Sequence, residues 1–108
     1  MEKVPIYNYD ESLLFFQGDD LEIPFGYGAS LAGVEVVMLV KEKIDDSDED
    51  TLLSIDLTVA DEAAGEGCFV FSAEQTADLL RQKHFVVRAD DGEKIETQYM
   101  GTMSWVKR

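Results

Sequence analysis

Alternation of apolar and polar residues is the feature that most restricts what this chain can fold into. From Leu53 to Val59 every second residue is apolar, and Ser54, Asp56 and Thr58 lie between them. Successive side chains of a strand point to opposite faces, so this segment predicts one continuous strand with a buried face. A shift of one residue would bury Asp56, and the register is therefore strongly specified.

Further segments with the same period of two predict additional strands. Pro24 lacks a backbone donor, so the strand that contains it should lie at a sheet edge or break there. Short strands separated by turns are typical of an all-β sandwich that is mainly antiparallel. The segments are Leu21–Phe25, Val34–Lys41 (expected to be a central strand), Phe69–Phe71 and Phe85–Ala89.

Asp91-Gly92 lies between two alternating runs and predicts a β-hairpin, because glycine tolerates a positive φ. The return strand is expected at Ile95–Tyr99. Gly101 is expected to mark a bulge or bend before the last apolar residues.

One short helix is predicted at Ala73–Leu80. Ser72 precedes Gln75 by three residues, which is the spacing of a capping box. The segment is rich in good helix formers and places Ala77 and Leu80 on one side. The fold class expected from the residues is thus all-β, a β-sandwich with one short helix.

The chain has 108 residues and a hydrophobic fraction of 45%, enough for a single domain, 1–108, with a real core. Truncation of a core residue such as Ile55 to alanine is expected to cost about 2–5 kcal/mol. The predicted core comprises Leu21, Ile23, Val36, Met38, Ile55, Leu57, Phe69, Phe71, Phe85 and Val87.

Charge narrows the possible partners. The formal net charge is -14, and no basic residue occurs between Lys43 and Arg81. Such a surface repels nucleic acid and anionic lipid and favours a basic partner. No apolar run is long enough to span a bilayer and no signal peptide is visible, so a cytoplasmic protein that makes no contact with a membrane is expected.

The densest acidic segment is a candidate partner contact. It contains five acids in six residues and no glycine or glutamate at the positions that an EF-hand loop requires. Mutual repulsion predicts an exposed, mobile hairpin tip without a tight metal, and weak cation binding stays open as the alternative. The five candidate residues are Asp45, Asp46, Asp48, Glu49 and Asp50.

The remaining reactive residues predict no chemistry. His84 is the only histidine and is expected on the polar face of its strand, and Cys68 is expected to be a small buried residue. One His and one Cys supply neither a catalytic triad nor a zinc site. Gly26-Tyr-Gly28 and Gly65-Glu-Gly67 are interpreted as turns, because neither completes a dinucleotide motif. We therefore expect no enzyme activity, no catalytic residues, no cofactor and no metal.

The order of several motifs resembles a known family. Leu13-Leu-Phe-Phe-Gln17 leads into Gly18-Asp19-Asp20 and Leu21-Glu-Ile-Pro24, followed by Leu31-Ala-Gly33 and a strand ending in Val40-Lys41. Later come Gly67-Cys-Phe-Val-Phe-Ser72, the segment Glu74–Leu79, Phe85–Ala89, Asp91-Gly92 and Met100-Gly101. Over nearly the whole chain this is similar to the immunoglobulin-like β-sandwich modules of bacteriophage tails and baseplates, in particular the N-terminal domain of baseplate upper proteins.

The resemblance implies an immunoglobulin-like antiparallel β-sandwich that acts as a structural module of a phage or prophage tail. Its partners would be other tail or baseplate proteins, one of them a basic subunit, or further copies of itself, and it could be part of a virion. The family has no enzymatic residues to transfer. Contact would run through an exposed strand edge or the acidic segment.

The alternative is an acidic protein of a mobile element that mimics nucleic acid and inhibits a DNA-binding enzyme. Net charge and size fit such a mimic. The long neutral strands and the clustering of acids in one loop fit it less well.

Overall fold

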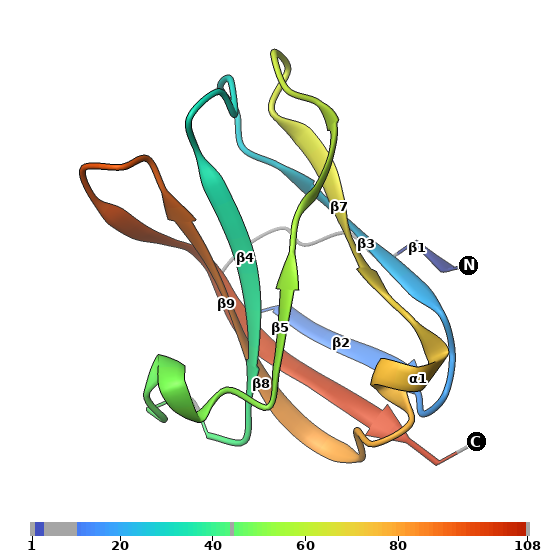
Figure 1. The fold of residues 1–108 in the computed structure, drawn as a ribbon. Coiled ribbons are helices and arrows are strands. Elements are labelled where there is room, and N and C mark those ends of the chain that lie inside the picture. The colour runs from blue at the N-terminus through green and yellow to red at the C-terminus, as the bar shows by residue number, and fades with distance from the viewer. Residues whose placement is uncertain (1, 4–10, 44, 108) are drawn as a thin grey trace.

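The computed structural model describes residues 2–3, 11–43 and 45–107, with only the backbone at 2, 3, 11–13 and 48. Two β-sheets face each other and enclose one core (Figure 1). The predicted all-β sandwich with a short helix is therefore confirmed.

The smaller sheet has the order β1-β3-β7-β6 and the larger one β2-β9-β8-β4-β5. Pairing is antiparallel except between β1 and β3 and between β2 and β9, which are parallel. The first sheet consists of β1 (Glu2–Lys3), β3 (Leu21–Gly26), β7 (Glu66–Phe71) and β6 (Thr58–Asp61). The second consists of β2 (Glu11–Phe16), β9 (Ile95–Val106), β8 (Arg81–Asp90), β4 (Glu35–Lys41) and β5 (Leu53–Asp56).

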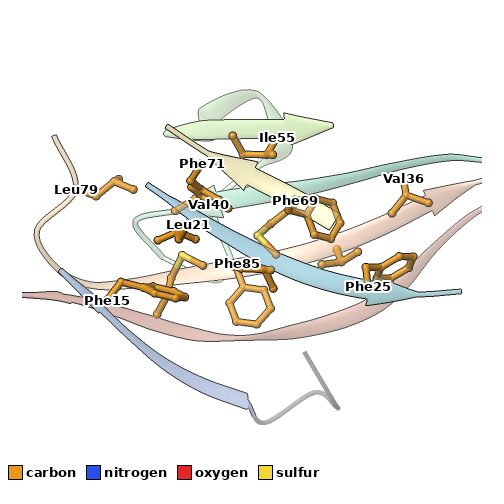
Figure 2. Packing of buried hydrophobic residues seen from close by; sticks show 14 of the residues in the cluster. Phe15, Leu21, Phe25, Val36, Val40, Ile55, Phe69, Phe71, Leu79 and Phe85 are labelled. Carbon is orange, nitrogen blue, oxygen red and sulfur yellow. The ribbon is translucent and has the colours of Figure 1, made fainter. Parts of the chain in front are cut away.

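The core lies between the inner faces that the alternating patterns predicted. Nine of the ten predicted core residues are buried, and Leu57 is the exception because it is only partly buried against the cluster. Phe25 and Phe69 of the smaller sheet pack edge to face with ring centroids 5.6 Å apart, and Figure 2 shows both among the buried side chains. Phe15 on β2 is buried and packs on Trp105 of β9 at 4.9 Å. The two sheets meet through Phe25 on Tyr99 and Phe71 on Trp105, with ring centroids 5.8 Å and 6.2 Å apart.

The strand that contains Pro24 was predicted to lie at a sheet edge or to break at the proline. β3 runs unbroken through Pro24, which faces Cys68 of β7. β1 pairs with β3 only at Leu21 and Glu22. Within the described part of the chain, Pro24 therefore has a strand neighbour on one side only, where its missing donor is tolerated.

The prediction of one strand from Leu53 to Val59 is wrong. β5 pairs with β4 in the larger sheet, whereas β6 pairs with β7 in the smaller sheet. The chain changes sheets at Leu57, whose backbone N–H still donates to the Val36 carbonyl at 3.0 Å. Gly67 permits this crossing, because a Cβ atom at this position would lie 2.5 Å from the Thr58 carbonyl oxygen.

The helix is shorter than predicted. α1 spans Ala73–Thr76, and its capping box between Ser72 and Gln75 is present as expected. Thr76 is buried and its hydroxyl donates to the Asp19 carbonyl at 2.8 Å. After the helix Leu79 enters the core, whereas Leu80, which was expected within the helix, lies outside it and is 38% exposed.

The hairpin at Asp91-Gly92 is confirmed, with Gly92 at φ 93° between β8 and β9. The predicted bulge at Gly101 is wrong, because Gly101 pairs regularly with Phe85. The ladder instead shifts where Val87 faces Tyr99 and the next residue faces Thr97, which leaves Gln98 as the extra residue. β9 continues to Val106 and is more than twice as long as the predicted return strand, Ile95–Tyr99.

Candidate protein–protein interface

The predicted acidic segment connects β4 to β5 and contains a 3-10 turn at Asp48–Asp50. It extends from the lower end of the larger sheet (Figure 1, green). Asp45, Glu49 and Asp50 are exposed as predicted, and Asp46 is half-buried. The side chain of Asp48 lies outside the described residues.

A buried lysine holds this loop. Lys41 at the end of β4 is 2% exposed, and its Nζ donates to the Asp46 carbonyl at 2.9 Å. The Asp46 carboxylate accepts the backbone N–H of Lys43 at 3.1 Å. Burying an ammonium group is costly unless it is hydrogen-bonded near negative charge, and the acidic loop supplies both. This contact was not predicted, although Lys41 ends a strand four residues before the first of the five acids. Mobility of the loop stays a prediction.

An apolar hollow of about 340 Å³ lies beside the loop, against the segment that follows α1. Leu52, Leu53 and Leu79 provide its apolar lining, and Leu52 is 49% exposed. Glu42 and Asp78 add two carboxylates to the lining. We call the hollow together with residues 42–52 the acidic end.

Of the described residues that line the hollow, Lys83 carries a positive charge, and it already forms an ion pair with Glu42. Its Nζ lies 2.9 Å from Glu42 Oε2, and its side chain is 12% exposed. Asp78, which is exposed, is the other carboxylate of this lining and has no unpaired lysine beside it among the described lining residues. An incoming cationic group would find negative charge next to apolar surface.

The fold divides the acidic stretch that is continuous in sequence. Asp45–Asp50 lie in the connection at the lower end of β4 and β5 (Figure 1). Asp61, Glu62 and Glu66 surround the turn between β6 and β7, at the opposite end of these strands. This second turn packs on the β3–β4 connection, where the Tyr27 N–H donates to the Gly65 carbonyl at 2.8 Å. The stretch between Lys43 and Arg81 consequently does not form one face.

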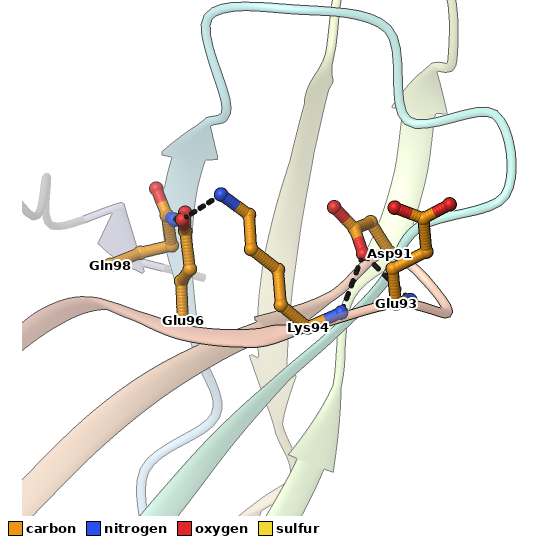
Figure 3. A network of polar contacts seen from close by, with 5 residues as sticks. All are labelled: Asp91, Glu93, Lys94, Glu96 and Gln98. Atoms are coloured by element: carbon orange, nitrogen blue, oxygen red, sulfur yellow. Dashed lines mark hydrogen bonds and ion pairs between the residues drawn. The ribbon is translucent and has the colours of Figure 1, made fainter.

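Carboxylates of the β8–β9 hairpin have a structural use. The backbone N–H groups of Glu93 and Lys94 both donate to Asp91 Oδ1 at 2.9 Å (Figure 3). These bonds, from Lys94 first and then Glu93, hold the pKa of Asp91 below its ordinary value. Lys94 in turn contacts Glu96 at 2.7 Å, and this hydrogen bond raises the pKa of Lys94.

His84 and Cys68 lie on outer faces of different sheets and do not meet. His84 is half-buried between Lys41 and Thr102 in the ladder of the larger sheet. Cys68 is half-buried, not buried as predicted, because it faces outward on β7, with its Sγ 3.6 Å from Glu22 Oε1. Within residues 2–3, 11–43 and 45–107 no three or more His, Cys, Asp or Glu side chains are grouped to hold a metal ion. The expectation that the acidic loop binds no tight calcium stays a prediction.

Comparison with known proteins adds little. No protein-family model matches the chain, and no curated protein matches it at a significant level. A crystal structure of an uncharacterized protein from Bacillus anthracis str. Ames aligns with 90% of this chain and 85% of its own length, at 12% identity and a TM-score of 0.48. That likeness is too weak to assign fold or function, and the sandwich is established by its own strand pairing. No helix in the described part of the chain has the length and apolar character to cross a bilayer.

Proposed function

We propose that this protein is a non-catalytic assembly module that works by protein–protein contact, and that its acidic end binds a basic partner. The observation that carries the proposal is the combination found there. Exposed carboxylates border an apolar hollow whose lining lysine is already paired with Glu42. Apolar burial would supply affinity, and the charges would set the association rate and the choice of partner.

We further propose that the module is immunoglobulin-like and belongs to a phage or prophage tail or baseplate. Strand order supports the first part. The order β1-β3-β7-β6 corresponds to the ABED sheet of immunoglobulin domains, and β2-β9-β8-β4-β5 corresponds to their GFCC′ sheet with β2 added beside β9. The tail assignment rests on the sequence resemblance, and with it the expected partners (other tail proteins), a cytoplasmic location in the host bacterium and incorporation into a virion.

A nucleic-acid mimic is the weaker alternative. A mimic needs carboxylates spaced along one face, like the phosphates of a duplex. Here the acidic stretch is divided between two ends of a body that measures 38 × 30 × 23 Å. The division favours two separate local contacts over one long charged face.

Co-expression with the neighbouring genes, followed by affinity capture at low and physiological salt, tests the proposal. The test variant carries D45N, D46N, D48N, E49Q and D50N. A matched control carries D61N, E62Q and E66Q at the opposite end. We expect the test variant to lose the captured partner and the control to retain it. Capture should also weaken as salt rises, because exposed charges are screened beyond about 8–10 Å.

Each part of the proposal can fail separately. If the test variant and the wild type captured the same amount of partner, the acidic end would not be the contact surface. Capture of a DNA-processing enzyme in place of a tail component would favour the mimic.

A further inference from the structure

β2 forms one edge of the larger sheet and, in the described part of the chain, has a partner strand on one side only. The Gln17 N–H, just after β2, donates to the Val106 carbonyl of β9 at 2.8 Å. Backbone groups of a strand alternate between its two sides, so the N–H groups of Leu14 and Phe16 point away from β9. The Phe16 carbonyl accepts from the Asp19 N–H at 3.3 Å. Among the described residues, the N–H and carbonyl of Leu14 therefore remain for a further strand.

β2 has none of the devices that block pairing at a sheet edge. Edge strands are commonly protected by lysine, by proline or by a bulge. The six residues of β2 are Glu-Ser-Leu-Leu-Phe-Phe, with neither lysine nor proline, and their register with β9 has no shift. Such an edge is a template for pairing with another strand.

Exposed apolar side chains border this edge. Leu14 is 63% exposed and Phe16 is 49% exposed, and both lie on the outer face because Phe15 between them is buried in the core. Val106 of β9 is 41% exposed and pairs with Phe16, so it lies on the same face. Contiguous apolar residues on a surface mark an interaction site.

The charge along the edge favours a second copy of this chain as the occupant. No charged residue occurs from Ser12 to Gln17, although the net charge of the chain is -14. Two copies therefore repel each other less here than at their acidic surfaces, and a basic partner would find no carboxylate in this segment. Glu11 begins β2, and the exposed Lys107 follows Val106 at the other end. Antiparallel pairing places the end of each strand beside the start of the other, which brings these opposite charges toward each other.

We propose that two copies of this chain form a symmetric dimer by antiparallel pairing of their β2 edges, which joins the two larger sheets into one. A two-fold axis uses each β2 once, so the assembly closes at two copies. Leu14, Phe16 and Val106 of both copies would then meet on the outer face. Residues 42–52 of the acidic end connect β4 to β5, at the other edge of the larger sheet. The dimer is therefore independent of the function proposed above and leaves residues 42–52 of each copy accessible.

Sedimentation velocity of the whole protein tests the inference. A six-residue edge is about 20 Å long, which is short for a standard interface, so we expect a weak dimer that forms between about 10 μM and 1 mM. Dimerisation should strengthen as salt rises from about 50 to about 500 mM, because repulsion between the two net charges is screened. Binding of a basic partner at the acidic end should show the opposite dependence on salt.

Two matched variants locate the contact. Leu14→Lys should weaken the dimer at least about tenfold, because it places a charge on the paired edge. Ile95→Lys is the control, since Ile95 is also an aliphatic residue and is 64% exposed in β9, and it should leave dimerisation unchanged.

Hydrogen exchange of the wild-type protein reads the backbone pairing directly. The amides of Leu14 and Phe16 should exchange about tenfold more slowly in the dimer than in the monomer, because they gain a strand partner. The amide of Phe15, which points toward β9, should exchange at the same rate in both.

Four results would overturn the inference. The first is a monomer at every concentration and salt. The second is a dimer that Leu14→Lys leaves intact, because the contact would then lie elsewhere. The third is a dimer in which exchange at Leu14 is unchanged. The fourth is growth beyond two copies, because the association would then be open and not two-fold.

Discussion

β5 and β6 are consecutive four-residue strands with the same alternating character, yet their environments differ. In β5, Ile55 is buried against the core and pairs with Met38. In β6, all four residues from Thr58 to Asp61 are exposed. Both strands are sheet edges, so edge position does not explain the contrast. Alternation states which residues share a face of a strand, but the opposing sheet decides whether that face meets a core.

The first prediction tests the buried half of this comparison. Ile55→Ala should lower the free energy of unfolding by about 2–5 kcal/mol, since it removes buried methyl groups and leaves a cavity. Denaturant unfolding measures the change. Ser54→Ala on the exposed face of β5 is the control and should stay within about 0.5 kcal/mol. A loss below about 1 kcal/mol for Ile55→Ala would mean that β5 does not close the core.

The second prediction concerns the crossing between the two strands. Gly67→Ala should cost about 1–3 kcal/mol, because the new Cβ would press on the Thr58 carbonyl and the Leu57 side chain and force the backbone to shift. Gly26→Ala is the matched control in the facing strand, where a Cβ meets no described atom within 4 Å. Comparable melting temperatures for the two variants would show that the close approach at Gly67 is unimportant.

The third prediction concerns the residue at which the chain changes sheets. Leu57→Ala should cost about 1–2 kcal/mol, less than Ile55→Ala, because Leu57 is only partly buried and has less transfer free energy to lose. Thermal unfolding of both variants side by side gives the ranking. A larger loss for Leu57→Ala than for Ile55→Ala would show that Leu57, where the chain changes sheets, contributes more to core packing than β5 does.

The smallest effect on stability is expected in β6. Val59→Thr should change the free energy of unfolding by less than about 0.5 kcal/mol, since the side chain is exposed and threonine suits a strand. A large loss of stability would show that β6 is buried in solution, by a partner or another copy.

Features that depend on neighbours in sequence were predictable. The inward faces of Leu21–Phe25 and Phe85–Ala89, the capping box of Ser72 and Gln75, and the hairpin at Asp91-Gly92 follow from side-chain period and turn chemistry. Exposure of Asp45, Glu49 and Asp50 follows from repulsion between close carboxylates. These forces act within a few residues, so the amino-acid order alone contains them.

Only the tertiary structure decided where the chain changes sheets, where the helix ends and which charge is buried. Leu57 becomes a crossing point because Gly67, ten residues further along the chain, leaves room for the Thr58 carbonyl. The helix ends at Thr76 because Leu79 has a place in the core, and Lys41 is buried because the loop returns to cover it. The change of sheet and the end of the helix depend on packing between separate elements, and the burial of Lys41 depends on how the loop five residues further along folds back. Alternation carries no information about which sheet a strand will join.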